Sequence, residues 1–193
     1  MTKEERKALY EKMAIEDGCE EILNNAKLNH LLNSTEFVNE NGILVYTGGF
    51  FEAPASTKYH GAYEGGLFDH LKNTYVRLKK LTEQNGLRWQ SPLSVWKIAW
   101  LHDTCKFDQY IYDSVEKAWH YNPDTVEKGH GDKSVKLVRN CIDLTDEEAL
   151  CIRFHMGAYE KEAWKEFDDA IHQTENVLWT HMADMLASKI DEE

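Results

Sequence analysis

An almost wholly apolar run from Val95 to Leu101 leads directly into the pair His102–Asp103. The apolar residues would lie on most sides of a helix, which predicts a central and buried position. A His and an Asp at the end of a buried helix carry a large desolvation cost unless another group compensates it. A divalent metal ion does so, because it binds a neutral imidazole nitrogen and a carboxylate oxygen. For this dipeptide alone, however, a solvent-facing helix end is the better interpretation.

Two further segments place ligand-type residues in similar settings. His70 follows Gly65 and Gly66, which would allow the backbone to turn sharply at the start of a helix. Asp184 lies in the string HMADMLAS, and its apolar neighbours do not suit a solvated surface carboxylate. Together with His102–Asp103, these residues come from three separate predicted helices. They predict one metal ion held by four ligands: His70, His102, Asp103 and Asp184.

Two more histidines extend the series. His130 stands between two glycines in KGHGDKS, and His155 ends a predicted helix in IRFHMG. Each alone is better explained as a polar loop or helix-end residue. As members of an ordered series they indicate a second metal site, with Asp103 as the bridging carboxylate. Two metal ions about 3.5–4 Å apart can polarise a phosphate and activate water for in-line attack on phosphorus.

The hydrophobic periodicity predicts an all-α helical bundle with a small β-hairpin. At 193 residues the chain suits one domain, residues 1–193, with an N-terminal helical segment at 1–40 and a core at 51–188. Pro92 is expected at the first position of a helix capped by Ser91, and Thr145 with Glu148 forms a capping box. The remaining expectations are two helices within 3–32 broken at Asp17–Gly18, a strand or extended arm at 43–46, a structured loop at 48–66, a helix from 67 to about 83, a hairpin at 109–121, and helices at 132–141, 161–172 and 174–190.

Charge bears on the class of partner. Thirty-four acidic residues against twenty-two basic ones give a net charge of −12, which disfavours binding to a long nucleic acid. Bound divalent cations would offset part of this charge. Small phosphorylated substrates are therefore expected.

Cysteine usage and hydropathy bear on location. The four cysteines show no CxxC spacing, and reduced thiols are expected. We also expect a cytoplasmic protein without a membrane span, because no apolar run suits a signal peptide or a bilayer. A homodimer is left open by the N-terminal helices and the loop at 48–66.

With these residues in view, the chain from about Phe51 to Ser188 resembles the HD superfamily of metal-dependent phosphohydrolases. FFEAPASTKYHGAYEGGLFDH is similar to the PAS…HH-x-Y-x-GGL-x-x-H motif of bacterial and phage HD proteins. WLHDTCK is similar to L-H-D-I-G-K, with Thr104 and Cys105 in place of Ile and Gly. GHGDKS and IRFHMG resemble GHGEKS and IRWHMG of a small-protein branch, and HMADMLAS resembles the last family motif.

The resemblance implies His70, His102, Asp103 and Asp184 as the basic ligand set. The order H…HD…H…H…D also resembles the binuclear branch, which would place His130 and His155 on a second metal. The GYP motif is absent, so cyclic di-GMP specificity does not transfer. The implied cofactor is two divalent ions, chosen among Mn²⁺, Fe²⁺, Mg²⁺ and Zn²⁺.

The implied function is hydrolysis of phosphoester bonds in a nucleotide or a short nucleotide-derived molecule, first as a binuclear phosphodiesterase. A nucleotidase or a deoxynucleotide triphosphohydrolase is the alternative within the same class, and the acidic charge disfavours a 3′→5′ exonuclease. The rival from another class is a non-catalytic HD module that binds a nucleotide as a sensor.

Several other residues are candidates for the chemistry beside Asp103. Lys106 follows the HD pair and is predicted to bind a substrate phosphate, although a solvent-facing lysine explains it equally well. The resemblance places His60 where it would orient water or move a proton. His181, one helical turn before Asp184, suits either a supporting role or a core position. The weaker candidates for substrate contact are Lys133, Arg153, Trp119 and Tyr121.

Overall fold

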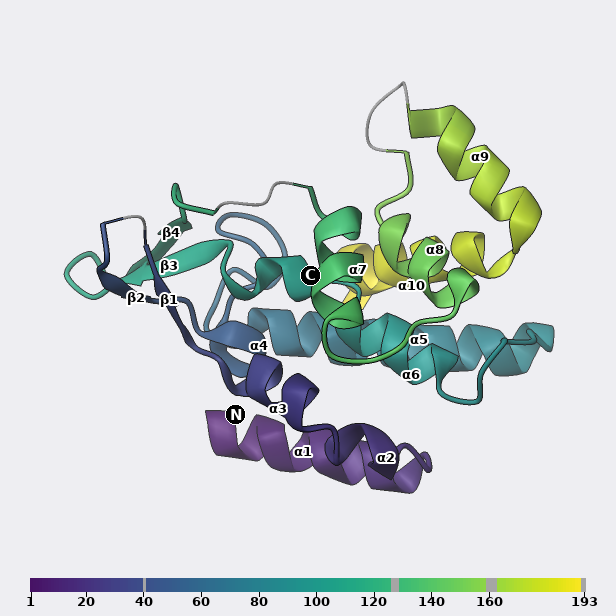
Figure 1. Ribbon diagram of the computed structural model, residues 1–193, viewed down its shortest axis with the longest axis horizontal. Coiled ribbons are helices and arrows are strands. Elements are labelled where there is room, and N and C mark those ends of the chain that lie inside the picture. The colour runs from purple at the N-terminus through teal and green to yellow at the C-terminus, as the bar shows by residue number, and fades with distance from the viewer. Residues whose placement is uncertain (40, 126–128, 159–162, 192–193) are drawn as a thin grey trace.

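Two neighbouring helices, α5 (Gly66–Asn85) and α6 (Ser94–Leu101), run side by side through the centre of the molecule (Figure 1). The computed structural model describes residues 1–39, 41–125, 129–158 and 163–191. The fold is mostly helical with two small two-stranded antiparallel sheets, as the periodicity predicts. Helix α6 is buried on nearly every side, because its sequence offers few polar positions.

An aromatic cluster packs around α6. The ring of Trp100 is fully buried, and its centroid lies 5.1–6.0 Å from those of Tyr10, Phe50, Phe68 and Tyr75. Edge-on and tilted arrangements of this kind add to the free energy gained from burial. The cluster therefore gives α6 a rigid base directly before His102.

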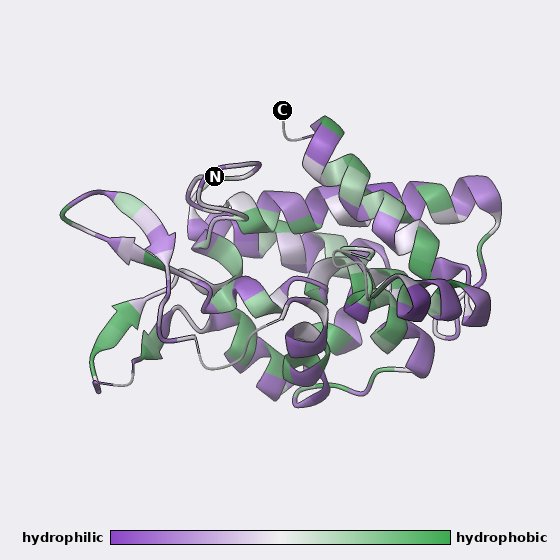
Figure 2. Cartoon of the chain, turned by 90° about the horizontal axis from the view of Figure 1, so that it is seen from above, coloured by the Kyte–Doolittle hydropathy of each residue, from purple (hydrophilic) through white to green (hydrophobic). Residues whose placement is uncertain are grey.

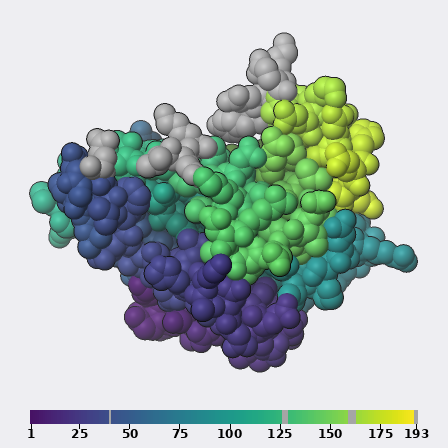
Figure 3. Space-filling view, viewed as in Figure 1, coloured from purple at the N-terminus to yellow at the C-terminus, as the bar shows by residue number. Residues whose placement is uncertain are grey.

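The N-terminal helices cover one edge of the molecule: α1 (Lys3–Glu16), α2 (Glu20–Leu23) and α3 (Ala26–Asn33) (Figure 3). The predicted break at Asp17–Gly18 is confirmed, and Gly18 has a positive φ of 68°. The second predicted helix is divided in two, because the side chain of Asn25 accepts a hydrogen bond from the Leu28 amide and starts α3.

The two sheets are ribbons at one end of the molecule (Figure 1). The residues predicted as a strand or extended arm form β2 (Leu44–Tyr46), which pairs with β1 (Glu36–Val38). The loop that follows contains a short helix, α4 (Gly49–Glu52). The predicted hairpin is confirmed as β3 (Tyr110–Asp113) and β4 (Ala118–Tyr121).

The predicted start of the helix after Ser91 is wrong. The carbonyl of Ser91 accepts from the Ser94 amide at 3.1 Å, which forms a tight turn. The first α-helical bond then joins the Lys97 amide to the Leu93 carbonyl at 2.9 Å, so that α6 begins at Ser94 and Pro92 lies outside it.

The C-terminal half supplies a 3₁₀ turn, η1 (Thr104–Phe107), and the helices α7 (Gly131–Arg139), α8 (Asp146–Arg153), α9 (Trp164–Gln173) and α10 (Asn176–Leu186). The capping box of α8 is confirmed, with Thr145 and Glu148 exchanging side-chain and amide bonds. The predicted start of α9 at Lys161 lies outside the described residues. The last predicted helix ends in a π-helical turn, η3 (Ala187–Asp191).

Hydrophilic and hydrophobic residues alternate along the helices (Figure 2). Within the described part of the chain, no helix combines the length and the apolar character that a membrane crossing requires.

Candidate metal centre

Three ligand-type side chains from α5, the end of α6 and α10 converge in the interior. Nε2 of His70 lies 3.0 Å from Oδ1 of Asp184 and 3.3 Å from Nε2 of His102. Nε2 of His102 lies 3.6 Å from the same Asp184 oxygen. All three side chains are buried, and their donor atoms are close enough to surround one ion.

Asp103 lies between this group and a second one. Its Oδ2 is 3.5 Å from Nε2 of His70 and 3.6 Å from Nε2 of His102. Its Oδ1 faces the other way, 3.4 Å from Nε2 of His155 and 3.8 Å from Sγ of Cys105. The nearest donors of the two oxygens thus differ, as a bridging ligand requires, while His102 belongs to both groups.

His130 reaches the second group through Cys105. Its Nδ1 lies 3.5 Å from Sγ of Cys105, and a nitrogen of His130, the thiol and an Asp103 oxygen all lie within 4.8 Å of one another. His155 instead groups with His102 and Asp103. All six predicted ligand residues therefore meet around Asp103, with Cys105 added to them.

Backbone carbonyls set the orientation of two imidazoles. Nδ1 of His102 donates to the carbonyl of Ala99 at 2.9 Å, and Nδ1 of His155 donates to that of Ile152 at 2.7 Å. A carbonyl oxygen can only accept, so each Nδ1 carries a proton, and in the neutral form of each ring Nε2 presents a lone pair to the centre. This is the tautomer that a metal ligand needs.

The buried Nε2 of His155 tests whether these residues suit a metal ion. Among the described residues it has no hydrogen-bond partner, although Oδ1 of Asp103 lies 3.4 Å away. A buried polar nitrogen without a partner is costly. A divalent ion between this nitrogen and the carboxylate would satisfy both, so the donor set fits a metal.

The electrostatics of the centre suit cation binding. Burial raises the pKa of Asp103, but the charges of Lys106 and His102 outweigh it and hold that pKa well below its usual value. Burial likewise raises the pKa of Asp184, and hydrogen bonds with His102 and His70 outweigh it. Both carboxylates are therefore ionised. Burial lowers the pKa of His102 more than the carboxylates raise it, which favours the neutral ligand form.

Two glycines allow close backbone approach near the ligands. A Cβ on Gly66 would lie 2.0 Å from the Gly61 carbonyl oxygen, and a Cβ on Gly131 would lie 1.9 Å from that of Arg153. The first contact sets the start of α5 before His70. The second places the start of α7, and with it His130, against the end of α8 before His155.

Arg6 is a supporting residue that the sequence did not reveal. Its guanidinium is buried and donates to the carbonyls of Phe51 at 3.1 Å and Glu64 at 2.8 Å. It thereby fastens α1 to the loop that precedes α5. His181 has a similar role, because its Nδ1 donates to the carbonyl of His155 at 2.8 Å.

The predicted cationic residues have different surroundings. Lys106 is buried, with Nζ 2.7 Å from Oδ2 of Asp103. Lys133 is also buried and pairs with Asp108 at 2.5 Å. Arg153 is not brought to the centre, since its guanidinium makes surface ion pairs at 2.8 Å and 2.9 Å with Asp132 and Glu166.

Of the predicted aromatic and histidine contacts, two residues line the cavity at the centre and one does not. Trp119 packs in the ribbons, with ring centroids 6.1 Å from Tyr46 and 5.2 Å from Tyr112. Tyr121, on the same strand, instead lines the cavity at the centre. His60 lines that cavity too, and its ring centroid lies 5.3 Å from that of His70.

Two adjoining cavities lead to the ligands. The first, of about 320 Å³, is lined by His70, Asp103, Asp184 and Lys106 among others. The second, of about 440 Å³, includes Lys133 and Asn122. The residues that line both are Gln109, Tyr121 and His130.

Gln109 organises the wall between the two cavities. Its Nε2 donates to the hydroxyls of Tyr110 at 3.1 Å and Tyr121 at 3.0 Å. Nothing in its local sequence signals this position, because the contacts depend on the pairing of β3 with β4.

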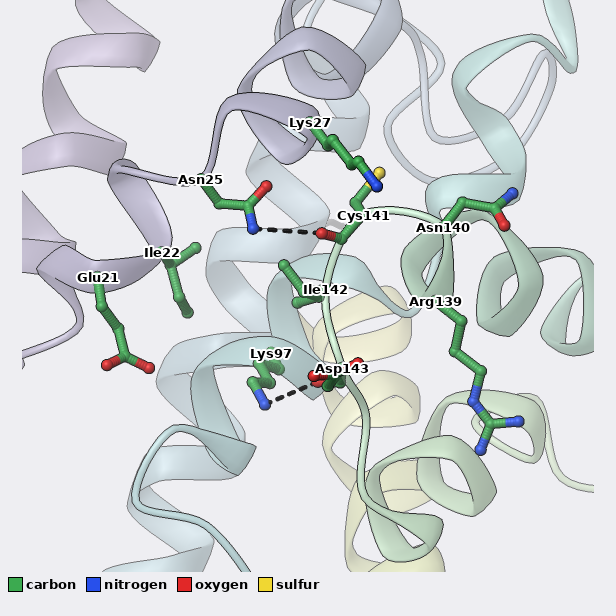
Figure 4. Close-up of a pocket in the computed structure, with 10 residues that line it drawn as sticks. All are labelled: Glu21, Ile22, Asn25, Lys27, Lys97, Arg139, Asn140, Cys141, Ile142 and Asp143. Carbon is green, nitrogen blue, oxygen red and sulfur yellow. Dashed lines mark hydrogen bonds between the residues drawn. The ribbon is translucent and has the colours of Figure 1, made fainter.

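A third cavity, of about 390 Å³, is separate from the histidines and lies between the N-terminal helices and the segment after α7 (Figure 4). Asn25 donates to the Cys141 carbonyl at 3.2 Å there, and Lys97 donates to that of Asp143 at 3.0 Å. These bonds attach the segment after α7 to α6 and to the start of α3, so the residues around this cavity stabilise the fold.

Comparisons with protein-family models, curated proteins and solved structures find no match to this chain. The helical fold and the buried cluster of histidines and aspartates are compatible with an HD domain, and the residues of the cluster could hold metal.

Proposed function

We propose that this protein is a divalent-metal-dependent phosphohydrolase of the HD type, acting on phosphoester bonds of a small nucleotide-type substrate. The observation that supports it most is the position of Asp103, whose two oxygens face separate donor groups. A surface ion-pair network would not require two buried carboxylates among four histidines. A binuclear hydrolytic centre would.

Bound divalent ions would supply Lewis acidity toward phosphate oxygens and lower the pKa of water. The residues that would hold them are His70, His102, Asp103, Asp184, His155 and His130.

Lys106 and His60 are suited to bind the phosphate and to deliver a proton. The Lys106 ammonium lines the cavity beside Asp103 and could pair with a phosphate oxygen, where it would offset charge that develops in the transition state. His60 lines the same cavity beside His70 and could deliver a proton to the leaving oxygen.

The cavities support a short substrate. The phosphate would lie over Asp103, and the rest of the molecule would extend past Tyr121 into the second cavity, where Asn122 and the Lys133–Asp108 pair offer polar contacts. The ring of Tyr121 is largely exposed and could stack with a base. The net charge of −12 is a poor match for a long phosphate backbone.

The test is reconstitution of metal-free protein with saturating Mn²⁺ and, in parallel, with Zn²⁺, beside His130→Ala and Asp103→Ala. We expect two ions in the wild type, one in His130→Ala, and loss of both binding and activity in Asp103→Ala. Turnover would be measured with bis(p-nitrophenyl) phosphate and cyclic nucleotides. An Asp103→Ala protein with full activity would reject the proposal.

A nucleotidase with one ion is the second candidate. It is favoured by the tight grouping of His70, His102 and Asp184, and by the direction of His130 toward Cys105 rather than His155. One ion in both wild type and His130→Ala, with turnover of nucleoside mono- or triphosphates, would select it. A thermal shift on nucleotide addition without turnover of any substrate would instead indicate a sensor.

A further inference from the structure

Cys105 is a buried thiol at the edge of the metal centre. Its side chain is 1% exposed, and its Sγ lies 3.5 Å from Nδ1 of His130 and 3.8 Å from Oδ1 of Asp103. Its backbone amide donates to Oγ of Ser134 at 3.1 Å, which ties η1 to α7. The residue therefore cannot turn away from the two ligands without disturbing both elements.

The separations match those between ligands of one tetrahedral ion. Zinc binds sulfur at about 2.3 Å and nitrogen or oxygen at about 2.0–2.2 Å, and tetrahedral angles then place such ligands roughly 3.6 Å apart. The two Sγ distances, 3.5 Å to the imidazole and 3.8 Å to the carboxylate, lie on either side of that value. Nε2 of His155 lies 3.4 Å from the same Oδ1 and has no hydrogen-bond partner in the described part of the chain, which independently indicates a cation on this side of Asp103.

We infer that Cys105 is a thiolate ligand of the ion held by Asp103 and His130, and that it makes this site select Zn²⁺ over Mg²⁺ and Mn²⁺. The inference rests on the metal centre proposed above and adds the identity of one ion. Soft thiolate sulfur favours Zn²⁺, whereas Mg²⁺ and Mn²⁺ prefer oxygen. On binding, the sulfur–metal bond forms as the thiol proton is released to solvent.

The alternative is a structural thiol that only donates a hydrogen bond to Asp103. Serine would preserve that donor but is a poor ligand for a soft ion, so Cys105→Ser separates the two roles. Cys141→Ser is the matched control, because Cys141 lies beside the third cavity, away from the histidines.

The experiment is anaerobic titration of metal-free protein with Co²⁺, which substitutes for Zn²⁺ and gives a near-ultraviolet charge-transfer band when bound to thiolate. We expect the band in wild type and Cys141→Ser, and its loss in Cys105→Ser. Loss of an outer partner of a ligand weakens metal binding about 10–100-fold. Loss of Cys105 should weaken Zn²⁺ binding at one site by at least that much, with little change for Mn²⁺.

Two bound cobalt ions in the wild type without the band would overturn the inference and leave the metal centre intact. Persistence of the band in Cys105→Ser would overturn it as well. Failure of the wild type to bind any ion would reject both the centre and its thiolate ligand. If Cys105→Ser does not fold, the wild type alone decides the question. The charge-transfer band must then be present, and Zn²⁺ must displace Mn²⁺ from one site in competition.

Discussion

Nζ of Lys106 lies 2.7 Å from Oδ2 of Asp103, one helical turn away in the chain, and both side chains are buried. Burial lowers the pKa of Lys106, but the Asp103 carboxylate outweighs it and raises that pKa above its usual value. Both groups are therefore charged, and each is the main compensation for the desolvation of the other.

Replacing Lys106 by Met should destabilise the metal-free protein by about 3–5 kcal/mol, because it leaves a buried carboxylate without its cation. Added Mn²⁺ should reduce this loss, since the ion supplies the missing positive charge. Urea denaturation with and without Mn²⁺ measures both. If Lys106 also contacts substrate phosphate, kcat/KM of the loaded variant falls by about 10²–10³. An equal loss of stability with and without metal would contradict this account.

Gly131→Ala should remove one ion from the centre and leave the other. The added Cβ would collide with the carbonyl oxygen of Arg153, so the start of α7 must shift and carry His130 away. His70, His102 and Asp184 come from other elements and keep their positions. Metal stoichiometry is the measurement. Gly86→Ala is the control: its φ of 63° also strains a side chain, but the added Cβ meets no described atom within 4 Å at the end of α5, so both ions should stay bound.

Trp100→Ala should lower the free energy of unfolding by about 3–5 kcal/mol, because it empties the centre of the aromatic cluster. Trp164→Ala is the matched control. Its side chain is 60% exposed, and its loss should change stability by about 0.5 kcal/mol or less. Chemical denaturation of the two variants, monitored by far-ultraviolet circular dichroism, distinguishes the sites. Similar losses in both would contradict the packing described here.

The pair of Arg77 and Asp191 should contribute to stability only above acid pH. The hydrogen bonds from Arg77 lower the pKa of Asp191 in the folded state. A lowered folded pKa stabilises the protein above the unfolded aspartate value, near pH 4, and this contribution is lost as the pH falls through the folded pKa. The partly exposed pair contributes about 0.2–1 kcal/mol.

Comparison of wild type with Asp191→Asn isolates this pair. We expect the wild type to be the more stable protein at pH 7 and the two to converge toward pH 3 in urea denaturation. A difference that stays constant across this range would show that the carboxylate charge is not responsible.

Features carried by a few neighbouring residues were predictable. Thr145 and Glu148 form their capping box within one turn, and a positive φ at Gly18 ends α1 as expected. Strand β1 was missed because three residues carry too little periodicity. The start of α6 was misplaced because a turn and a helix cap share the same Ser-Pro signal.

The residues of the histidine and aspartate cluster could be selected for the same local reason, since each member sits in its own motif; their role as metal ligands stays a prediction. The contacts between separate helices and strands were not predictable. Arg153 and Lys133 are each close in sequence to a proposed ligand, yet Arg153 points to the surface and Lys133 faces a cavity. Gln109 and Cys105 acquire their positions only when η1, α7 and the hairpin come together.

The π-helical turn at Ala187–Asp191 is a place where one residue can be gained or lost after α10. A π turn holds more residues than an α turn and amounts to a local insertion. Ser188 and Lys189 reach the first cavity from this turn. Deleting Ala187 would move Ser188 and Lys189 by one helix position, a rotation of roughly 100° about the helix axis. A single residue gained or lost here would thus change the chemistry of the cavity edge and leave the buried histidines and aspartates upstream unchanged.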